Sequence, residues 1–162
     1  MDNSLFGLPP DLWYPLFAAF MFLAMITLVP RDHIKRLFAY GILFGFIAGW
    51  LVTVTGRALN LFQYQQMGPF TFIGSPVLVN MSWTAALVVF LHFLPHRRDA
   101  LYWLYIAGFS LMSTMIDDVT HRVGVLRYFF WSSYARFPLA FVWFWVAAVF
   151  YQKRESAPPD AG

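Results

Sequence analysis

Five apolar segments, separated by short polar stretches, follow one another along the chain. They cover residues 12–29, 37–55, 76–94, 100–116 and 131–151. Each is close in length to the roughly 20 apolar residues that a helix needs to cross a bilayer. The pattern therefore predicts an all-α, polytopic membrane helix bundle of about five transmembrane helices. We expect these helices to form a single domain over residues 1–151.

Residues that start or stop helices set several of these boundaries. Ser75 and Pro76 suit the beginning of the third helix, and Asp99 is a good N-cap for the fourth. Pro95 ends the third helix. The fifth segment is preceded by aromatic residues and contains Arg136, so its start is placed near residue 131. The polar residues 152–162 are expected to be a disordered cytoplasmic tail.

Composition supports a chain that is surrounded by lipid. Apolar residues make up 60% of the sequence and charged residues 12%, against about 45–50% and 25% in soluble domains. These values exclude an ordinary soluble domain, a disordered chain and a nucleic-acid-binding module. The absence of cysteine excludes disulfides and thiolate metal sites. The expected partner is the lipid bilayer, with no nucleic acid.

The distribution of charge predicts an orientation. Acidic residues precede the first segment and basic residues follow it, which indicates a retained anchor with its N-terminus outside and not a cleaved signal peptide. With this orientation the cytoplasmic side receives more Lys and Arg than the outer side, as the positive-inside rule requires. The cytoplasmic residues are Arg31, Lys35, Arg36, Arg97, Arg98, Lys153 and Arg154, and the outer ones are Arg57, Arg122, Arg127 and Arg136. We therefore expect a multi-pass protein of the cell membrane with a cytoplasmic C-terminus.

Three glycines, Gly41, Gly45 and Gly49, recur every four residues in the second segment. This spacing puts them on one helical face, where the lack of side chains lets another helix backbone come close. The partner is either a neighbouring helix of the same chain, or a second copy or another membrane protein. All of these interpretations are structural, and none implies catalysis.

The fourth segment carries a polar stripe that continues past its apolar end. Ser110, Ser113 or Thr114, Asp117 and His121 fall on one helical face, and Asp118 follows Asp117 in the sequence. Two carboxylates and an imidazole are suitable ligands for a divalent metal ion. A complete site needs further ligands, and no second acidic or histidine pair lies in another segment. Solvated acids at a helix end are the commoner explanation, so we assign no metal and no cofactor.

Arg136 lies inside or at the edge of the fifth segment, depending on where that helix starts. A start near residue 126 puts the guanidinium well inside the membrane, where Arg costs roughly 2.5–3.5 kcal/mol and needs a partner such as Asp117 or Asp118. A start at residue 131 or later lets the side chain snorkel to the outer headgroups. Snorkelling is the favoured interpretation, and either geometry places Arg136 near the outer interface.

Four landmarks are spread over most of the chain. They are the Val29-Pro30-Arg31 turn with Lys35-Arg36, the stretch from Phe70 to Asn80, Asp117-Asp118, and Gly124 followed by Leu126-Arg127-Tyr128. Their order resembles a family of small, uncharacterised multi-pass membrane proteins from spore-forming Gram-positive bacteria. The resemblance implies about five membrane helices and a membrane location. It implies no activity, so no functional residue is taken from it.

Two functions remain open at this point. The favoured one is a non-catalytic packing or partner-binding subunit of the bacterial cytoplasmic membrane, because the glycine row offers a packing face and the soluble parts are small. The alternative is a small carrier, channel or membrane enzyme that uses the polar cluster of Asp117, Asp118, His121 and Arg136. A water-filled pocket that reaches Asp117 and Arg136 would favour the alternative, and a dry bundle would favour the packing subunit.

Overall fold

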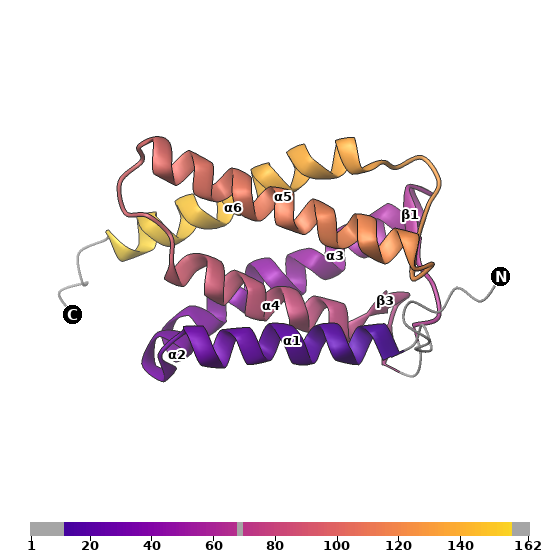
Figure 1. Ribbon diagram of the computed structural model, residues 1–162, viewed down its shortest axis with the longest axis horizontal. Coiled ribbons are helices and arrows are strands. Elements are labelled where there is room, and N and C mark those ends of the chain that lie inside the picture. The colour runs from indigo at the N-terminus through magenta and orange to yellow at the C-terminus, as the bar shows by residue number, and fades with distance from the viewer. Residues whose placement is uncertain (1–11, 68–69, 157–162) are drawn as a thin grey trace.

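A computed structural model describes residues 12–67 and 70–156 of the chain. In this part, helical rods run back and forth and lie side by side (Figure 1). The rods are α1 (Trp13–Leu28), the continuous run of α2 (Arg31–Tyr40), η3 (Gly41–Ile47) and α3 (Ala48–Ala58), then α4 (Val77–His92), α5 (Ala100–Arg122) and α6 (Ser133–Glu155). The predominantly helical fold predicted from the apolar pattern is therefore confirmed.

Two of these helices are long and apolar enough to cross a membrane, namely Arg31–Ala58 and Ser133–Glu155. α1 and α4 are apolar but shorter. α5 has 23 residues, and its last turns carry Asp117, Asp118 and Arg122. Length and composition thus support a membrane location weakly, through two helices.

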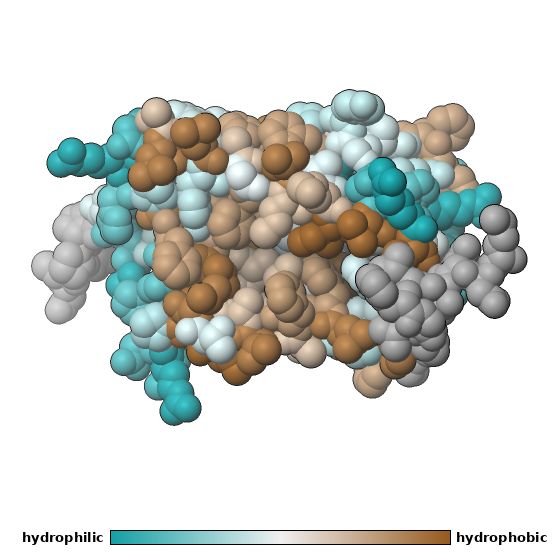
Figure 2. All heavy atoms as spheres, in the orientation of Figure 1, coloured by the Kyte–Doolittle hydropathy of each residue, from teal (hydrophilic) through white to brown (hydrophobic). Residues whose placement is uncertain are grey.

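The face of the bundle drawn in Figure 2 is apolar across its middle and polar at its ends. Figure 2 shows brown side chains across the centre of the molecule and teal side chains gathered at the two ends. Large apolar side chains of α1 and α5 are exposed, including Phe20, Ile26, Leu104 and Met115. Soluble monomers rarely expose so wide an apolar surface.

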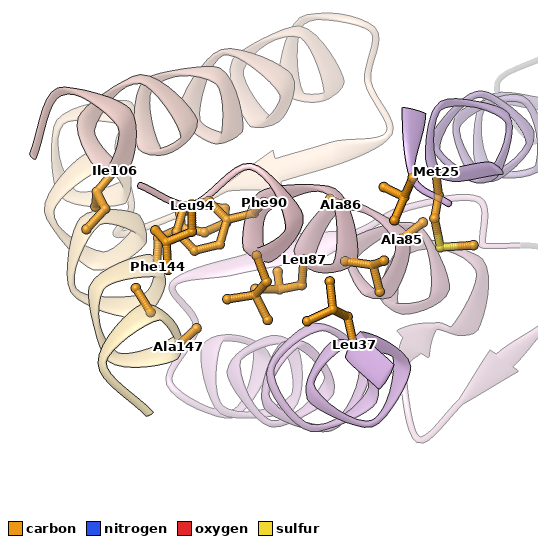
Figure 3. Close-up of a cluster of buried hydrophobic side chains, with 14 of the residues drawn as sticks. Met25, Leu37, Ala85, Ala86, Leu87, Phe90, Leu94, Ile106, Phe144 and Ala147 are labelled. Carbon is orange, nitrogen blue, oxygen red and sulfur yellow. The ribbon is translucent and has the colours of Figure 1, made fainter. Parts of the chain in front are cut away.

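α4 is the central helix of the bundle. Most of its residues are buried, and it packs against α1, α2, η3 and α3. Figure 3 shows Leu87 and Phe90 of α4 among side chains from α1, α2, α5 and α6. The ring of Phe90 lies 4.8 Å from that of Phe144, which joins α4 to the α5–α6 pair. The core therefore connects two groups of helices, α1–α4 and α5–α6.

Two short β ribbons lie where α3 and α5 end. β1 (Phe62–Tyr64) pairs with β4 (Leu126–Tyr128) in antiparallel register, and β2 (Thr71–Phe72) pairs with β3 (Ser75–Pro76). We call this end of the bundle the ribbon end. The apolar pattern did not predict these strands, because segments of two or three residues are too short to show an alternating pattern.

Several predicted boundaries are wrong, because polar residues continue the helices. The segment predicted at 37–55 belongs to a helix that spans Arg31–Ala58, and the one predicted at 100–116 continues to Arg122. The predicted disordered tail 152–162 begins inside α6, where Gln152 bonds with Arg98 and with the carbonyl of Pro95. Residues 157–162 of that tail lie outside the described residues. The other helices begin and end within four residues of their predicted positions.

Candidate functional site

A cavity of about 50 Å³ lies inside the bundle toward the ribbon end. It is bordered by residues of η3, α3, α4, α5, α6 and β1 and by the segment before α6. Its aromatic lining residues are Phe44, Phe62, Trp83, Trp131, Trp143 and Phe144. Its polar lining residues are Thr53, Tyr64, Asn80, Ser113, Asp117 and Arg136. The volume exceeds what a single water molecule needs, so polar groups of a ligand or several waters fit inside.

An ion pair between Arg136 and Asp117 forms part of the cavity wall. Nε of Arg136 donates to Oδ2 of Asp117, and Nη2 donates to the hydroxyl of Ser113 at 2.8 Å. The side chains of Arg136 and Asp117 are 16% and 11% exposed. The Arg136 guanidinium also lies 6.0 Å from the ring of Trp83, within the range of a cation–π contact. The snorkelled position favoured from the sequence is therefore wrong.

Local sequence explains how the pair meets. Ser113 and Asp117 are four residues apart on α5, so they share one face of that helix. Ser132 caps α6 by accepting a hydrogen bond from the amide of Ala135, which places Arg136 in the first turns of the helix. α5 and α6 pack closely side by side. The face of α5 that carries Asp117 therefore meets the start of α6. The sequence had indicated Asp117 as a possible partner of Arg136.

Asn80 lies in the part of the wall formed by α4. Its amide nitrogen donates to the hydroxyl of Ser75 at 2.9 Å, and the residue is almost completely buried. A Cβ on Gly49 would lie 3.4 Å from the side-chain oxygen Oδ1 of Asn80, so the two residues are in close proximity. Asn80 was not among the site residues predicted from the sequence, although a polar residue in an otherwise apolar helix is a recognisable signal.

Tyr64 reaches the cavity from the β1–β4 ribbon. Burial raises the pKa of its phenol well above the ordinary value, and the nearby Asp117 carboxylate raises it further. Tyr64 is therefore a neutral hydroxyl beside the ion pair. Backbone hydrogen bonds hold the ribbon in place, among them Gln65 to Val125 at 2.7 Å and Phe129 to Leu61 at 2.9 Å. No local pattern predicts this residue, because the ribbon brings it from a distant loop.

The other members of the predicted polar cluster point elsewhere. Asp118 accepts hydrogen bonds from Nε of Arg122 at 2.7 Å and from Ser133 at 3.2 Å. Nδ1 of His121 lies 2.9 Å from the carbonyl oxygen of Leu126, and its ring stacks on Tyr128. The predicted cluster is thus divided, and only Asp117 and Arg136 line the cavity. Within residues 12–67 and 70–156, no three His, Asp or Glu side chains are placed to hold a metal ion.

The glycine row faces α4 of the same chain. A Cβ on Gly45 would lie 2.5 Å from the backbone nitrogen of Thr84, and one on Gly41 would lie 2.9 Å from the Thr84 carbonyl oxygen. These two glycines therefore allow close packing between η3 and α4. Gly49 continues the row and borders the cavity.

Comparisons with protein-family models, curated proteins and solved structures find no match for this chain. What the cavity does must therefore follow from its own residues. Their arrangement provides a balanced ion pair, neutral hydroxyl and amide groups, and aromatic walls. These groups suit binding of a small polar group that is attached to an apolar one.

Proposed function

We propose that the chain is a multi-pass protein of the bacterial cytoplasmic membrane, with five membrane helices, its N-terminus outside and its C-terminus in the cytoplasm. The apolar middle and polar ends of the face in Figure 2, together with the two long apolar helices, support this location. The excess of Lys and Arg on the end opposite the ribbon supports the orientation. In this arrangement the ribbon end and its cavity face the outer half of the membrane.

We further propose that the protein binds a small ligand in this cavity, as a carrier or as a membrane enzyme would. The observation that carries the proposal is the mostly buried Asp117–Arg136 pair, which lines a cavity inside the bundle. Burying two charges costs free energy that the pair only partly recovers. Ionisable residues inside membrane bundles accordingly mark functional sites by default.

The packing-subunit function has less support from the geometry. The main evidence for it was the glycine row, but Gly41 and Gly45 pack against α4 of the same chain. An interface with a partner protein on the helix that carries these glycines would have to use another face. Association with a second copy or with another membrane protein therefore remains a proposal that no described contact favours.

The proposal is tested by the chemical accessibility of the cavity. The chain has no cysteine, so one introduced thiol reports on one position. Thr53 lines the cavity and is 7% exposed, whereas Thr120 is 4% exposed and lies elsewhere. Both hydroxyls bond to a carbonyl one turn earlier, which makes the two positions a matched pair.

We expect a small uncharged thiosulfonate to modify Thr53→Cys at least about tenfold faster than Thr120→Cys in nanodiscs, because only the first thiol faces an accessible space. Mass spectrometry of the intact protein measures both rates. Denatured samples of both variants should react equally fast, which checks the reagent. Equal slow rates in the folded variants would mean that the cavity is closed, and would rule out the proposed function.

A further inference from the structure

We propose that the cavity binds the hydroxyl headgroup of an uncharged, membrane-resident alcohol. This inference rests on the proposed function and names the chemical class of its ligand. It follows from the hydrogen-bonding positions that the ion pair leaves unused, from the charge balance of the site, and from the walls of the cavity.

The ion pair leaves one donor group and one acceptor atom without a protein partner. Arg136 uses Nε and Nη2, and Asp117 uses Oδ2. Among the described residues, Nη1 of Arg136 donates no hydrogen bond and Oδ1 of Asp117 accepts none. Both residues line the cavity.

A hydroxyl group matches the chemistry of both unused positions, a donor on Arg136 and an acceptor on Asp117. It donates one hydrogen bond and accepts others, so it can donate to Oδ1 of Asp117 and accept from Nη1 of Arg136. A ketone, ether or ester oxygen can only accept, and it would leave Oδ1 of Asp117 unpaired. Leaving a buried acceptor unpaired weakens binding, and this penalty is the basis for discriminating between otherwise similar ligands.

The charge of the site disfavours an anionic headgroup. The positive charge of Arg136 is already balanced by Asp117, and the remaining polar lining residues are neutral. A carboxylate or phosphate would place its charge beside Asp117 in a site of low polarity, where like charges repel strongly. It would also have to compete with Asp117 for Arg136, which would leave the aspartate stranded.

The walls of the cavity account for the apolar part of the ligand. Trp83, Trp131 and Trp143 line the cavity, and a volume of about 50 Å³ accepts a headgroup but not a long chain. α3 packs closely against η3, α4, β1 and β3, and α6 against α5, so α3 and α6 are not a closely packed pair in the described chain. We place the opening of the cavity between α3 and α6, where the apolar chain would lie along the lipid-facing surface.

The test uses the thiol of Thr53→Cys as the reporter and a series of probes with one chain length. 1-Dodecanol, dodecyl methyl ether and dodecanoate are added at equal mole fractions to nanodiscs that hold the variant. We expect dodecanol to slow modification of the thiol about tenfold more than the ether or the carboxylate does, because only the alcohol satisfies both unused positions. Butanol, added at equal membrane concentration, should protect less than dodecanol.

A second variant changes the charge of the site. Asp117→Asn in the Thr53→Cys background leaves Arg136 without its counter-charge, so protection should shift from dodecanol to dodecanoate. The matched control is Asp118→Asn, which lies outside the cavity and should leave the order of the probes unchanged. If Asp117→Asn does not fold, the probe series on the Thr53→Cys protein alone decides.

Several results would overturn the inference. Strongest protection by dodecanoate would indicate an anion site, and equal protection by all three probes would show that only the chain is recognised. Equal protection by butanol and dodecanol would indicate a water-soluble alcohol and not a lipid. All of these outcomes require that the thiol at position 53 reacts when no probe is present. If the proposed function is wrong, that thiol is already unreactive in the accessibility test, before any probe is added.

Discussion

Arg136 brings a permanent charge into the wall of an aromatic cavity, and Asp117 balances it. The two side chains are mostly buried and share Ser113 as a further partner. Removing one member of such a pair strands the other, which costs about 3–5 kcal/mol, whereas removing both leaves no charge behind. The stability of the protein should therefore depend on the two residues jointly.

A double-mutant cycle measures this dependence. Arg136→Met and Asp117→Asn should each lower the free energy of unfolding, and the double variant should recover part of the loss. We expect a coupling energy of about 3 kcal/mol or more, read from unfolding in detergent, because each single loss is about 3–5 kcal/mol and the double variant loses less than either. The control is the cycle of Arg136→Met with Asp118→Asn, where coupling should stay below about 0.5 kcal/mol because Asp118 pairs with Arg122. Equal coupling in both cycles would contradict the observed pairing.

At the residue scale, the sequence predicted which groups could meet but not their environment. Helix periodicity put Asp117 on the same face as Ser113, and a short connection placed Arg136 within reach. The burial of Asp117 and Arg136 depends on side chains such as Tyr64 and Trp83, which belong to other elements. The choice between a snorkelled and a buried arginine therefore could not be made from the local pattern.

At the scale of elements, the contact between η3 and α4 depends on the absence of side chains. η3 is a π-helix, and these wider turns often occur at functional positions. The carbonyl of Phe44 in this segment accepts a hydrogen bond from the indole of Trp143 at 3.0 Å. Close approach of the backbones and this bond together fix one wall of the cavity.

Gly45→Ala tests the close approach. Its Cβ would lie 2.5 Å from the Thr84 nitrogen and 2.6 Å from the Thr84 Cα, and backbone atoms of a central helix cannot move aside easily. We expect a loss of about 1–3 kcal/mol, typical of overpacking, measured by thermal unfolding in detergent.

Gly108→Ala is the matched control for this substitution. It lies on the exposed face of α5, and a Cβ there meets nothing within 4 Å. Since alanine favours helices more than glycine, this change should leave stability unchanged or raise it slightly. Similar losses at both positions would mean that the helices themselves, and not their packing, are sensitive to the change.

The long helices could be predicted because each holds a continuous apolar run. Their polar extensions, such as the last turns of α5 to Arg122, lack that signal. The strand β1 is three residues long, and its partner β4 lies more than sixty residues later in the sequence, so no local pattern predicts the ribbon. Elements held by distant pairing were missed for this reason.

At the scale of the whole molecule, the two ends differ in charge. The end that begins α2 and ends α6 carries Arg31, Lys35, Arg36, Lys153 and Arg154. A reporter that is active only in the cytoplasm should therefore be active when fused after Lys153 and silent when fused after Gln66. The reverse pattern would invert the orientation and place the cavity in the inner half of the membrane.

The pairing of β1 with β4 also has a consequence for biosynthesis. β1 is made before α4 and α5, and its partner follows α5. The ribbon therefore cannot form until most of the chain has left the ribosome, and the α6 part of the wall, with Arg136, is synthesised after it. Domains and their parts become available in the order of synthesis. A chain stalled before α6 would hold Asp117 without its counter-ion, so the ion pair and the cavity wall are completed only when α6 has been made.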